Sequence, residues 1–181
     1  KVYSIASAHH EVLDFCIQMN DPQLAAASLS WSPGVTQFSL KPAAGNFYNP
    51  PYETPVILIA GGSGVTPLKA IFEDRALASS EVAKTILLYG CGDDSEIPFY
   101  AELKNVVALS QGKAEVRFFA EHVLDRAGSR AEVGRPLSVL AQYVAHDSEY
   151  LMCGPPPFME ATRAALIKAG VSMQQIHQDR Y

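Results

Sequence analysis

The sequence has little of what marks several classes of protein. Its 181 residues include three cysteines, Cys16, Cys91 and Cys153, and no Cys-x-x-Cys pair. A disulfide framework, a zinc site and a cysteine-bound iron–sulfur cluster are therefore not expected, and we assign no metal site. The net charge of −5 argues against a nucleic-acid partner, because such proteins carry a basic stripe. No apolar run approaches the length of a membrane span.

The chain is rich in apolar residues, since 48% of its residues are hydrophobic and 18% are charged. This composition predicts a packed, soluble core. The chain starts with Lys1 and runs at once into a strand-like pattern, without a targeting segment. We therefore expect it to be cut from a longer protein, and its compartment cannot be read. His9 and His10 are adjacent and are expected in a solvated turn, because no third metal ligand stands nearby.

Two patterns divide the chain. In residues 1–48, polar and apolar residues alternate as in antiparallel strands, with a short helix expected over 23–29. Strands are expected at residues 1–7, 12–19 and 35–40. Residues 41–54 and the proline that follows contain four prolines and are expected to form a linker. From residue 55 onward strands alternate with helices, which predicts an α/β fold with a parallel, doubly wound sheet over 55–181.

Residues 55–67 read Pro-Val-Ile-Leu-Ile-Ala-Gly-Gly-Ser-Gly-Val-Thr-Pro. This pattern predicts a buried strand, a tight glycine turn and a helix, with Thr66 as the cap and Pro67 at the first helical position. Free amides at a helix start attract anions, and glycine lets a phosphate come close. An ordinary strand–helix turn has the same pattern. It is not a Walker A loop, since no Gly-Lys-Ser/Thr follows.

Three predicted strand ends are expected to meet at one edge of the sheet. They are the glycine turn at 61–66, Tyr89-Gly90-Cys91 and Cys153-Gly154-Pro155. In a doubly wound sheet the carboxyl ends of the strands face one ligand-binding crevice. Cys153 would shape this crevice, or would be a small buried residue that ends a strand. In neither case is it a thiolate nucleophile.

Four motifs together resemble the ferredoxin–NADP reductase superfamily. They are Tyr-Ser-Ile-Ala-Ser at 3–7, Gly-Gly-Ser-Gly-Val-Thr-Pro at 61–67, Leu-Leu-Tyr-Gly at 87–90 and Cys-Gly-Pro-Pro at 153–156. The resemblance implies that residues 1–48 are the C-terminal half of an antiparallel, FAD-binding β-barrel, with the first half upstream, and that 55–181 bind NAD(P)H. It implies hydride transfer from NAD(P)H to FAD and electron delivery to an acceptor, which can be a protein or a host electron-transfer complex.

The resemblance also implies roles for single residues. Tyr3 would pack on the flavin, Ser4 would lie near flavin N5, and Lys1 stands where the family has an arginine that reaches the flavin pyrophosphate. The expected catalytic positions are Ser4, Cys153 and Tyr181. Tyr181 would cover the flavin, or would be a frayed terminal residue. The expected nucleotide-binding residues are Gly61, Gly62, Gly64, Thr66, Tyr89, Gly90, Glu121, Cys153, Gly154 and Pro155.

Departures from the family pattern leave two questions. Glu121 stands where NADP-binding members carry a Ser-Arg pair, and a carboxylate favours ribose hydroxyls over a 2′-phosphate, which favours NADH. Lys1, Pro22 and Ala25 replace residues that contact the flavin phosphates, and lysine lacks the two-pronged contact of arginine. The alternative is therefore a non-catalytic, reductase-like subunit that acts as a structural or interaction component of an electron-transfer complex.

Overall fold

The computed structural model describes residues 3–8, 12–17, 19, 22–42, 44–45, 47–95, 97–123 and 128–179. Its centre is a six-stranded sheet in the order β4-β3-β2-β1-β5-β6, and every neighbouring pair is parallel. The strands are β1 (Val56–Gly61), β2 (Thr85–Asp93), β3 (Ala114–His122), β4 (Glu132–Val133), β5 (Glu149–Cys153) and β6 (Ile176–Gln178). The predicted parallel α/β sheet is confirmed.

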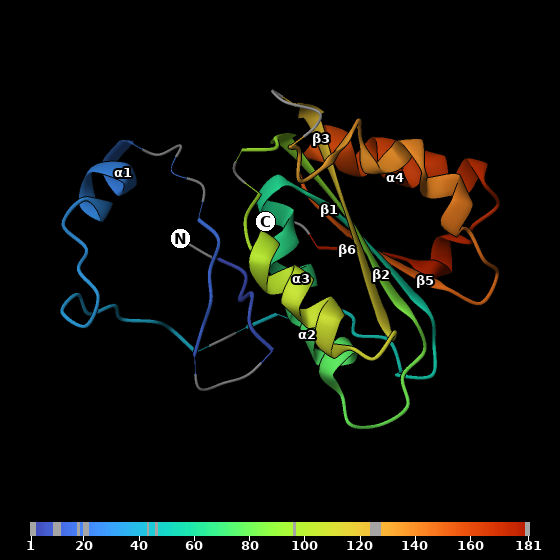
Figure 1. Ribbon diagram of the computed structural model, residues 1–181, viewed down its shortest axis with the longest axis horizontal. Helices are drawn as coiled ribbons and strands as arrows, with labels where there is room; N and C mark the ends of the chain where they lie inside the picture. Colours follow the sequence, from blue (N-terminus) through green and yellow to red (C-terminus); the bar gives the residue numbers. More distant parts are fainter. Residues whose placement is uncertain are drawn as a thin grey trace.

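Helices cover both faces of this sheet (Figure 1). The α-helices are α1 (Pro22–Ser28), α2 (Val65–Leu77), α3 (Tyr100–Leu109) and α4 (Pro156–Lys168). Short 3-10 turns are η1 (Gly62–Gly64), η2 (Pro136–Ser138), η3 (Leu140–Tyr143) and η4 (Met173–Gln175). Helices α2 and α3 lie on one face and α4 lies on the other, so the sheet is doubly wound (Figure 1). Between β4 and β5 the chain forms the two short turns η2 and η3 rather than an α-helix.

Strand β1 is buried along its whole length, because both of its faces pack against apolar layers. Val56, Leu58 and Ala60 belong to the core that contains residues of α2 and α3. Ile57 and Ile59 belong to the core that contains residues of η3 and α4. A strand covered on both faces reads as a continuous apolar run, which is why the sequence pattern located β1 correctly.

The N-terminal segment differs from the sequence prediction. The expected helix over 23–29 is present as α1, but residues 3–8, 12–17 and 31–42 contain no strand among those described. One backbone bond joins the first two segments, from the Ala6 amide to the Asp14 carbonyl at 2.8 Å. A strand needs a ladder of such bonds to a neighbour, so alternation alone did not produce one. That residues 1–48 belong to a flavin-binding barrel remains a prediction.

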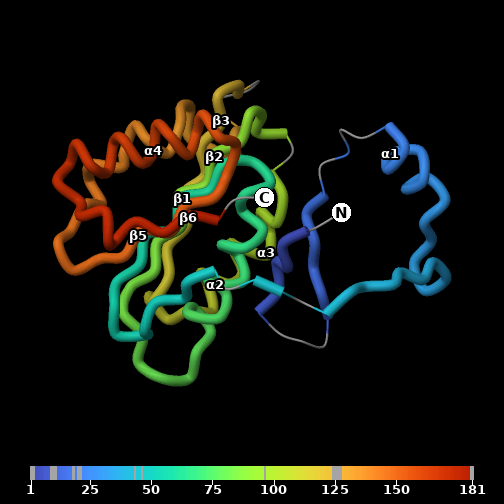
Figure 2. Tube along the Cα trace, turned by 180° about the vertical axis from the view of Figure 1, so that it is seen from behind, coloured from blue at the N-terminus to red at the C-terminus, as the bar shows by residue number. Residues whose placement is uncertain are grey.

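The proline-rich linker is fixed to the sheet unit by Arg75 of α2, whose side chain is 0% exposed. Its Nε donates to Thr85 Oγ1 at 2.9 Å. Its Nη atoms donate at 2.6 to 3.3 Å to the carbonyl oxygens of Pro50, Pro51, Tyr52 and Thr54. Beyond the linker, the N-terminal segment with α1 lies to one side of the sheet unit (Figures 1 and 2).

Candidate functional site

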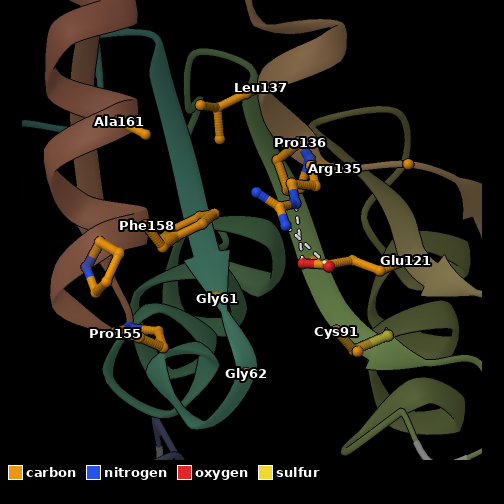
Figure 3. Close-up of a pocket in the computed structure, with 14 residues that line it drawn as sticks. Gly61, Gly62, Cys91, Glu121, Arg135, Pro136, Leu137, Pro155, Phe158 and Ala161 are labelled. Atoms are coloured by element: carbon orange, nitrogen blue, oxygen red, sulfur yellow. Dashed lines mark hydrogen bonds and ion pairs between the residues drawn. The ribbon is translucent and has the colours of Figure 1, made fainter.

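A pocket of about 350 Å³ opens at the carboxyl edge of the sheet. Its walls come from the ends of β1, β2 and β3, from the turn between β4 and η2, and from the loop and helix after β5 (Figure 3). The chain leaves β1 toward β2, β3 and β4 on one side and returns to β5 on the other. The pocket thus lies near the topological switch point, where open α/β sheets bind ligands, and its size is at the lower end of the roughly 300–1,000 Å³ of small-molecule sites.

Half of the predicted nucleotide-binding residues line this pocket. They are Gly61, Gly62, Gly90, Glu121 and Pro155. Gly62, in the η1 turn, has a φ of +55° and open space where a side chain would lie. A left-handed backbone with open space on its Cβ side is typical of a position at which a ligand can approach the main chain.

Three predicted glycines of two motifs, Gly61, Gly64 and Gly154, make room for the protein's own chain. A Cβ on Gly64 would meet the Cys153 carbonyl oxygen and would lie 2.6 Å from the Gly154 nitrogen. A Cβ on Gly61 or Gly154 would lie 2.9 Å or 2.8 Å from the ring of Phe158. These glycines therefore let the turn after β1, the loop after β5 and the start of α4 pack against one another, and Phe158 becomes an apolar wall of the pocket (Figure 3).

The predicted cap of α2 is wrong. The helix begins at Val65 with Gly64 as its N-cap and with no side-chain capping bond. Thr66 is 3% exposed, and its hydroxyl donates to the Ser63 carbonyl at 2.7 Å. Because the η1 turn starts the helical path earlier, Pro67 is the third helical residue and not the first.

Two further predicted residues are fully buried. Cys153 is 0% exposed, and burial raises the pKa of its thiol to about 12, with a smaller contribution from Asp179. The thiol is therefore protonated at neutral pH. Tyr89 is also 0% exposed, and its ring packs in the core on the α3 side, 6.2 Å from the ring of Phe118. The predicted contact between Tyr89 and a nucleotide would therefore have to be made by the Tyr89 backbone.

Sequence reasoning missed one charged residue of the pocket, Arg135. Its Nε and Nη2 each lie 2.9 Å from a carboxylate oxygen of Glu121 (Figure 3). The hydrogen bonding to Glu121 raises the pKa of the Arg135 guanidinium above its ordinary value. The signal for Arg135 in the sequence was the Gly-Arg-Pro run at 134–136, but nothing local pairs it with a residue on another strand.

The predicted flavin-side residues lie on the N-terminal segment. Tyr3 is 37% exposed and Ser4 is half-buried. Lys69 holds this segment against α2, since its Nζ donates to the Ala6 carbonyl at 3.2 Å and lies 3.5 Å from a carboxylate oxygen of Asp14. The predicted residues Lys1 and Tyr181, and the pair His9 and His10, lie outside the described residues.

Within the described ranges, no three His, Cys, Asp or Glu side chains are grouped so that they could hold a metal ion. Across the same part of the chain, no helix has both the length and the apolar character that a membrane crossing requires.

Comparison with known proteins agrees with this geometry. A sequence model of the family described as "Oxidoreductase NAD-binding domain" matches residues 58–164. The chain is 30% identical over 139 residues to the flavohemoprotein of Vibrio cholerae, covering 75% of this chain and 33% of that protein. It is 32% identical over 136 residues to the ferredoxin reductase component of 3-ketosteroid-9-alpha-monooxygenase from Mycobacterium tuberculosis, covering 74% of this chain and 35% of that protein. The chain thus spans about a third of the length of these curated relatives.

Solved structures show the same fold. The Amycolatopsis cytochrome P450 reductase GcoB superposes with a TM-score of 0.76 at 21% identity, over 98% of this chain and 55% of that one. The flavohem-like FAD/NAD-binding domain of nitric oxide dioxygenase from Vibrio cholerae gives a TM-score of 0.60 at 26% identity, over 76% of this chain and 55% of that one. With the matched family and its relatives, the sheet and pocket lead to one conclusion: the chain belongs to the oxidoreductase NAD-binding domain family and corresponds to the C-terminal portion of reductases of the ferredoxin–NADP reductase type.

Proposed function

We propose that this chain carries the nicotinamide-nucleotide part of a flavin-dependent reductase that passes a hydride from NAD(P)H to FAD and electrons onward to an acceptor. The observation that carries the proposal is the pocket beside the switch point, with Gly62 at one wall and the loop after Cys153 at another. A dinucleotide is long and needs an open groove at the carboxyl edge of a sheet, which is where this pocket lies.

Each wall of the pocket has a separate task in this proposal. The open backbone at Gly62 would receive the pyrophosphate, since amide groups at a strand–helix turn favour anions. Glu121, at the end of β3, would accept hydrogen bonds from ribose hydroxyls and so favour NADH. Phe158 and Pro155 give an apolar surface on the side of β5. This surface would shield the nicotinamide end from water.

The flavin side is proposed for the N-terminal segment. Bound FAD would supply a ring that accepts two electrons and releases them singly. Tyr3 offers an exposed aromatic ring for stacking and Ser4 a half-buried hydroxyl. Lys69 places this segment against α2, whose N-cap Gly64 packs on the backbone of Cys153. Buried and neutral, Cys153 would keep the meeting point of the two rings narrow and apolar.

The acceptor is proposed to be a protein. The relative from Mycobacterium tuberculosis bears the name of a ferredoxin reductase component, which supports a partner that receives electrons.

The test is a titration of the full-length protein with FAD, followed by anaerobic addition of NADH or NADPH, with absorbance at the flavin band as the readout. We expect stoichiometric flavin that bleaches with NADH at lower concentration than with NADPH. Gly62→Ala should weaken nucleotide binding, measured by calorimetry. Its matched control is Gly112→Ala, because Gly112 also has a positive φ, +86°, and open space, but does not line the pocket.

Each outcome is decisive. Bleaching by either nucleotide, with loss of affinity in Gly62→Ala alone, supports the reductase. Nucleotide binding without any flavin uptake contradicts the reductase reaction and favours the non-catalytic subunit. Absence of both kinds of binding contradicts the whole proposal.

A further inference from the structure

The pocket contains one pair of opposite charges. Among the described residues that line it, Glu121 and Arg135 are the ones with charged side chains, and the remainder are glycine, proline, cysteine, alanine, leucine or phenylalanine. The two side chains face each other from the end of β3 and from the turn after β4 (Figure 3). If the charges of these lining residues distinguish one ligand from another, this pair must therefore do so.

The backbone that carries Arg135 is held firmly. The amide of the preceding Gly134 donates to the Ala120 carbonyl of β3 at 2.8 Å. The Arg135 carbonyl accepts bonds from the Ser138 amide at 2.9 Å and from the Ser138 hydroxyl at 2.7 Å. The neighbouring strand β4 is fixed through Glu132, which Arg117 binds through two nitrogens at 2.8 and 2.7 Å. These contacts therefore fix the backbone of Arg135 beside Glu121.

The side chains of the pair, in contrast, are open to solvent. That of Arg135 is 66% exposed and that of Glu121 is 44% exposed. An ion pair in water contributes little free energy because water solvates the separated charges almost as well. The pair can therefore open for a ligand at small cost, while its backbone stays in place.

The two groups prefer different riboses. A carboxylate accepts hydrogen bonds from a 2′,3′-diol and repels a 2′-phosphate. A guanidinium matches a phosphate with two parallel, charge-assisted bonds. Alone, Glu121 would select NADH and Arg135 would select NADPH. Joined, each reduces the preference of the other.

We propose that Arg135 is a specificity-determining residue: it stays on Glu121 when the adenosine ribose carries two hydroxyls, and it leaves Glu121 to bind the phosphate when the ribose carries a 2′-phosphate. The inference rests on the proposed function, because it assumes that the pocket binds a nicotinamide dinucleotide. It makes the pocket accept both NADH and NADPH, with a small preference set by the pair.

The test uses two fragments that differ by one 2′-phosphate, 5′-AMP and 2′,5′-ADP, titrated into the full chain by calorimetry. Arg135→Ala should weaken 2′,5′-ADP by about tenfold relative to 5′-AMP, since a charge-assisted phosphate contact is lost. Arg135→Lys should give a ratio of the two affinities between those of the wild type and Arg135→Ala, because a lysine ammonium cannot make the two parallel bonds of a guanidinium. Glu121→Gln should shift the ratio the other way. Exposed residues of α3 give matched controls, Lys104→Ala and Glu102→Gln, which should leave the ratio unchanged.

The outcomes separate the two levels of the proposal. If the wild-type chain binds both fragments and neither pocket variant changes their ratio beyond its control, the role of Arg135 is refuted while nucleotide binding stands. If the wild-type chain binds neither fragment, the inference and the nucleotide-binding part of the proposed function fall together. Opposite shifts in the two pocket variants support the inference.

Discussion

The contacts of Arg75 make a sharp prediction about stability. This side chain is 0% exposed and uses its guanidinium donors on Thr85 and on four carbonyls of the linker. We predict that Arg75→Met destabilises the fold strongly, because methionine fills most of the space but donates no hydrogen bond.

The magnitude follows from the burial of the individual bonds. Two of them, to Thr85 Oγ1 and to the Pro50 carbonyl, both at 2.9 Å, are buried, and loss of a buried partner costs about 1–3 kcal/mol each. The remaining bonds are partly exposed, so water replaces the donor there. Burial of the cation, which lowers the pKa of Arg75, opposes folding and is relieved in the variant. We therefore expect a net loss of about 3 kcal/mol.

Urea denaturation followed by circular dichroism measures this loss. With a slope of about 2 kcal/mol per molar urea, the midpoint should fall by about 1.5 M. The matched control is Lys168→Met, which removes a basic residue from the last turn of α4 just as Arg75→Met does in α2. Lys168 is exposed and its loss should cost under about 0.5 kcal/mol. Equal shifts of the urea midpoint in the two variants would refute the reasoning, because they would mean that Arg75 contributes only as a charge at the end of a helix.

Three further predictions concern other contacts. Gly64→Ala should cost about 3 kcal/mol in the same assay, since its Cβ would lie 2.6 Å from a backbone nitrogen of the loop after β5; Gly92→Ala, with nothing within 4 Å, should cost far less. Because burial raises the folded pKa of Cys153 to about 12, above its unfolded value of about 8.5, the unfolding free energy should decline as the pH rises from about 8.5 toward 12, and Cys153→Ala should flatten that decline. Lys69→Met should speed amide exchange in residues 3–8 and 12–17, measured by mass spectrometry, because the Lys69 ammonium donates to the Ala6 carbonyl at 3.2 Å; unchanged exchange would contradict this role of Lys69.

The sequence predicted the sheet unit well and the N-terminal segment poorly, for one physical reason. The interior strands carry continuous apolar runs because they are covered on both faces, and such runs are visible without knowledge of the neighbours. Alternation in residues 3–17 indicates only that a strand could form. Whether it does depends on a partner for its backbone groups, and the local pattern carries no information about that partner.

The pocket lies where the sequence placed the candidate site, but its details differ from the prediction. The rule that ligands bind at the carboxyl edge of a doubly wound sheet located the pocket and five of its residues. The glycine motif was taken to admit a phosphate, whereas Gly61 and Gly64 make room for Phe158 and for the loop after β5. A glycine shows that something comes close, not what it is. Arg135 was missed because its partner Glu121 becomes its neighbour only through the pairing of β3 with β4.

Helix α2 connects the two parts of the chain, and its stiffness has a consequence for the proposed reaction. Its N-cap Gly64 packs on the end of β5, Lys69 holds the N-terminal segment, and Arg75 holds the linker. These residues span about 16 Å at 1.5 Å per residue on a rigid element. Displacement of the segment that bears Tyr3 and Ser4 must therefore either break the Lys69 contacts or carry α2, and with it the pocket turn, along. The distance between a flavin on that segment and a nucleotide in the pocket would thus be set by one helix rather than by a flexible hinge.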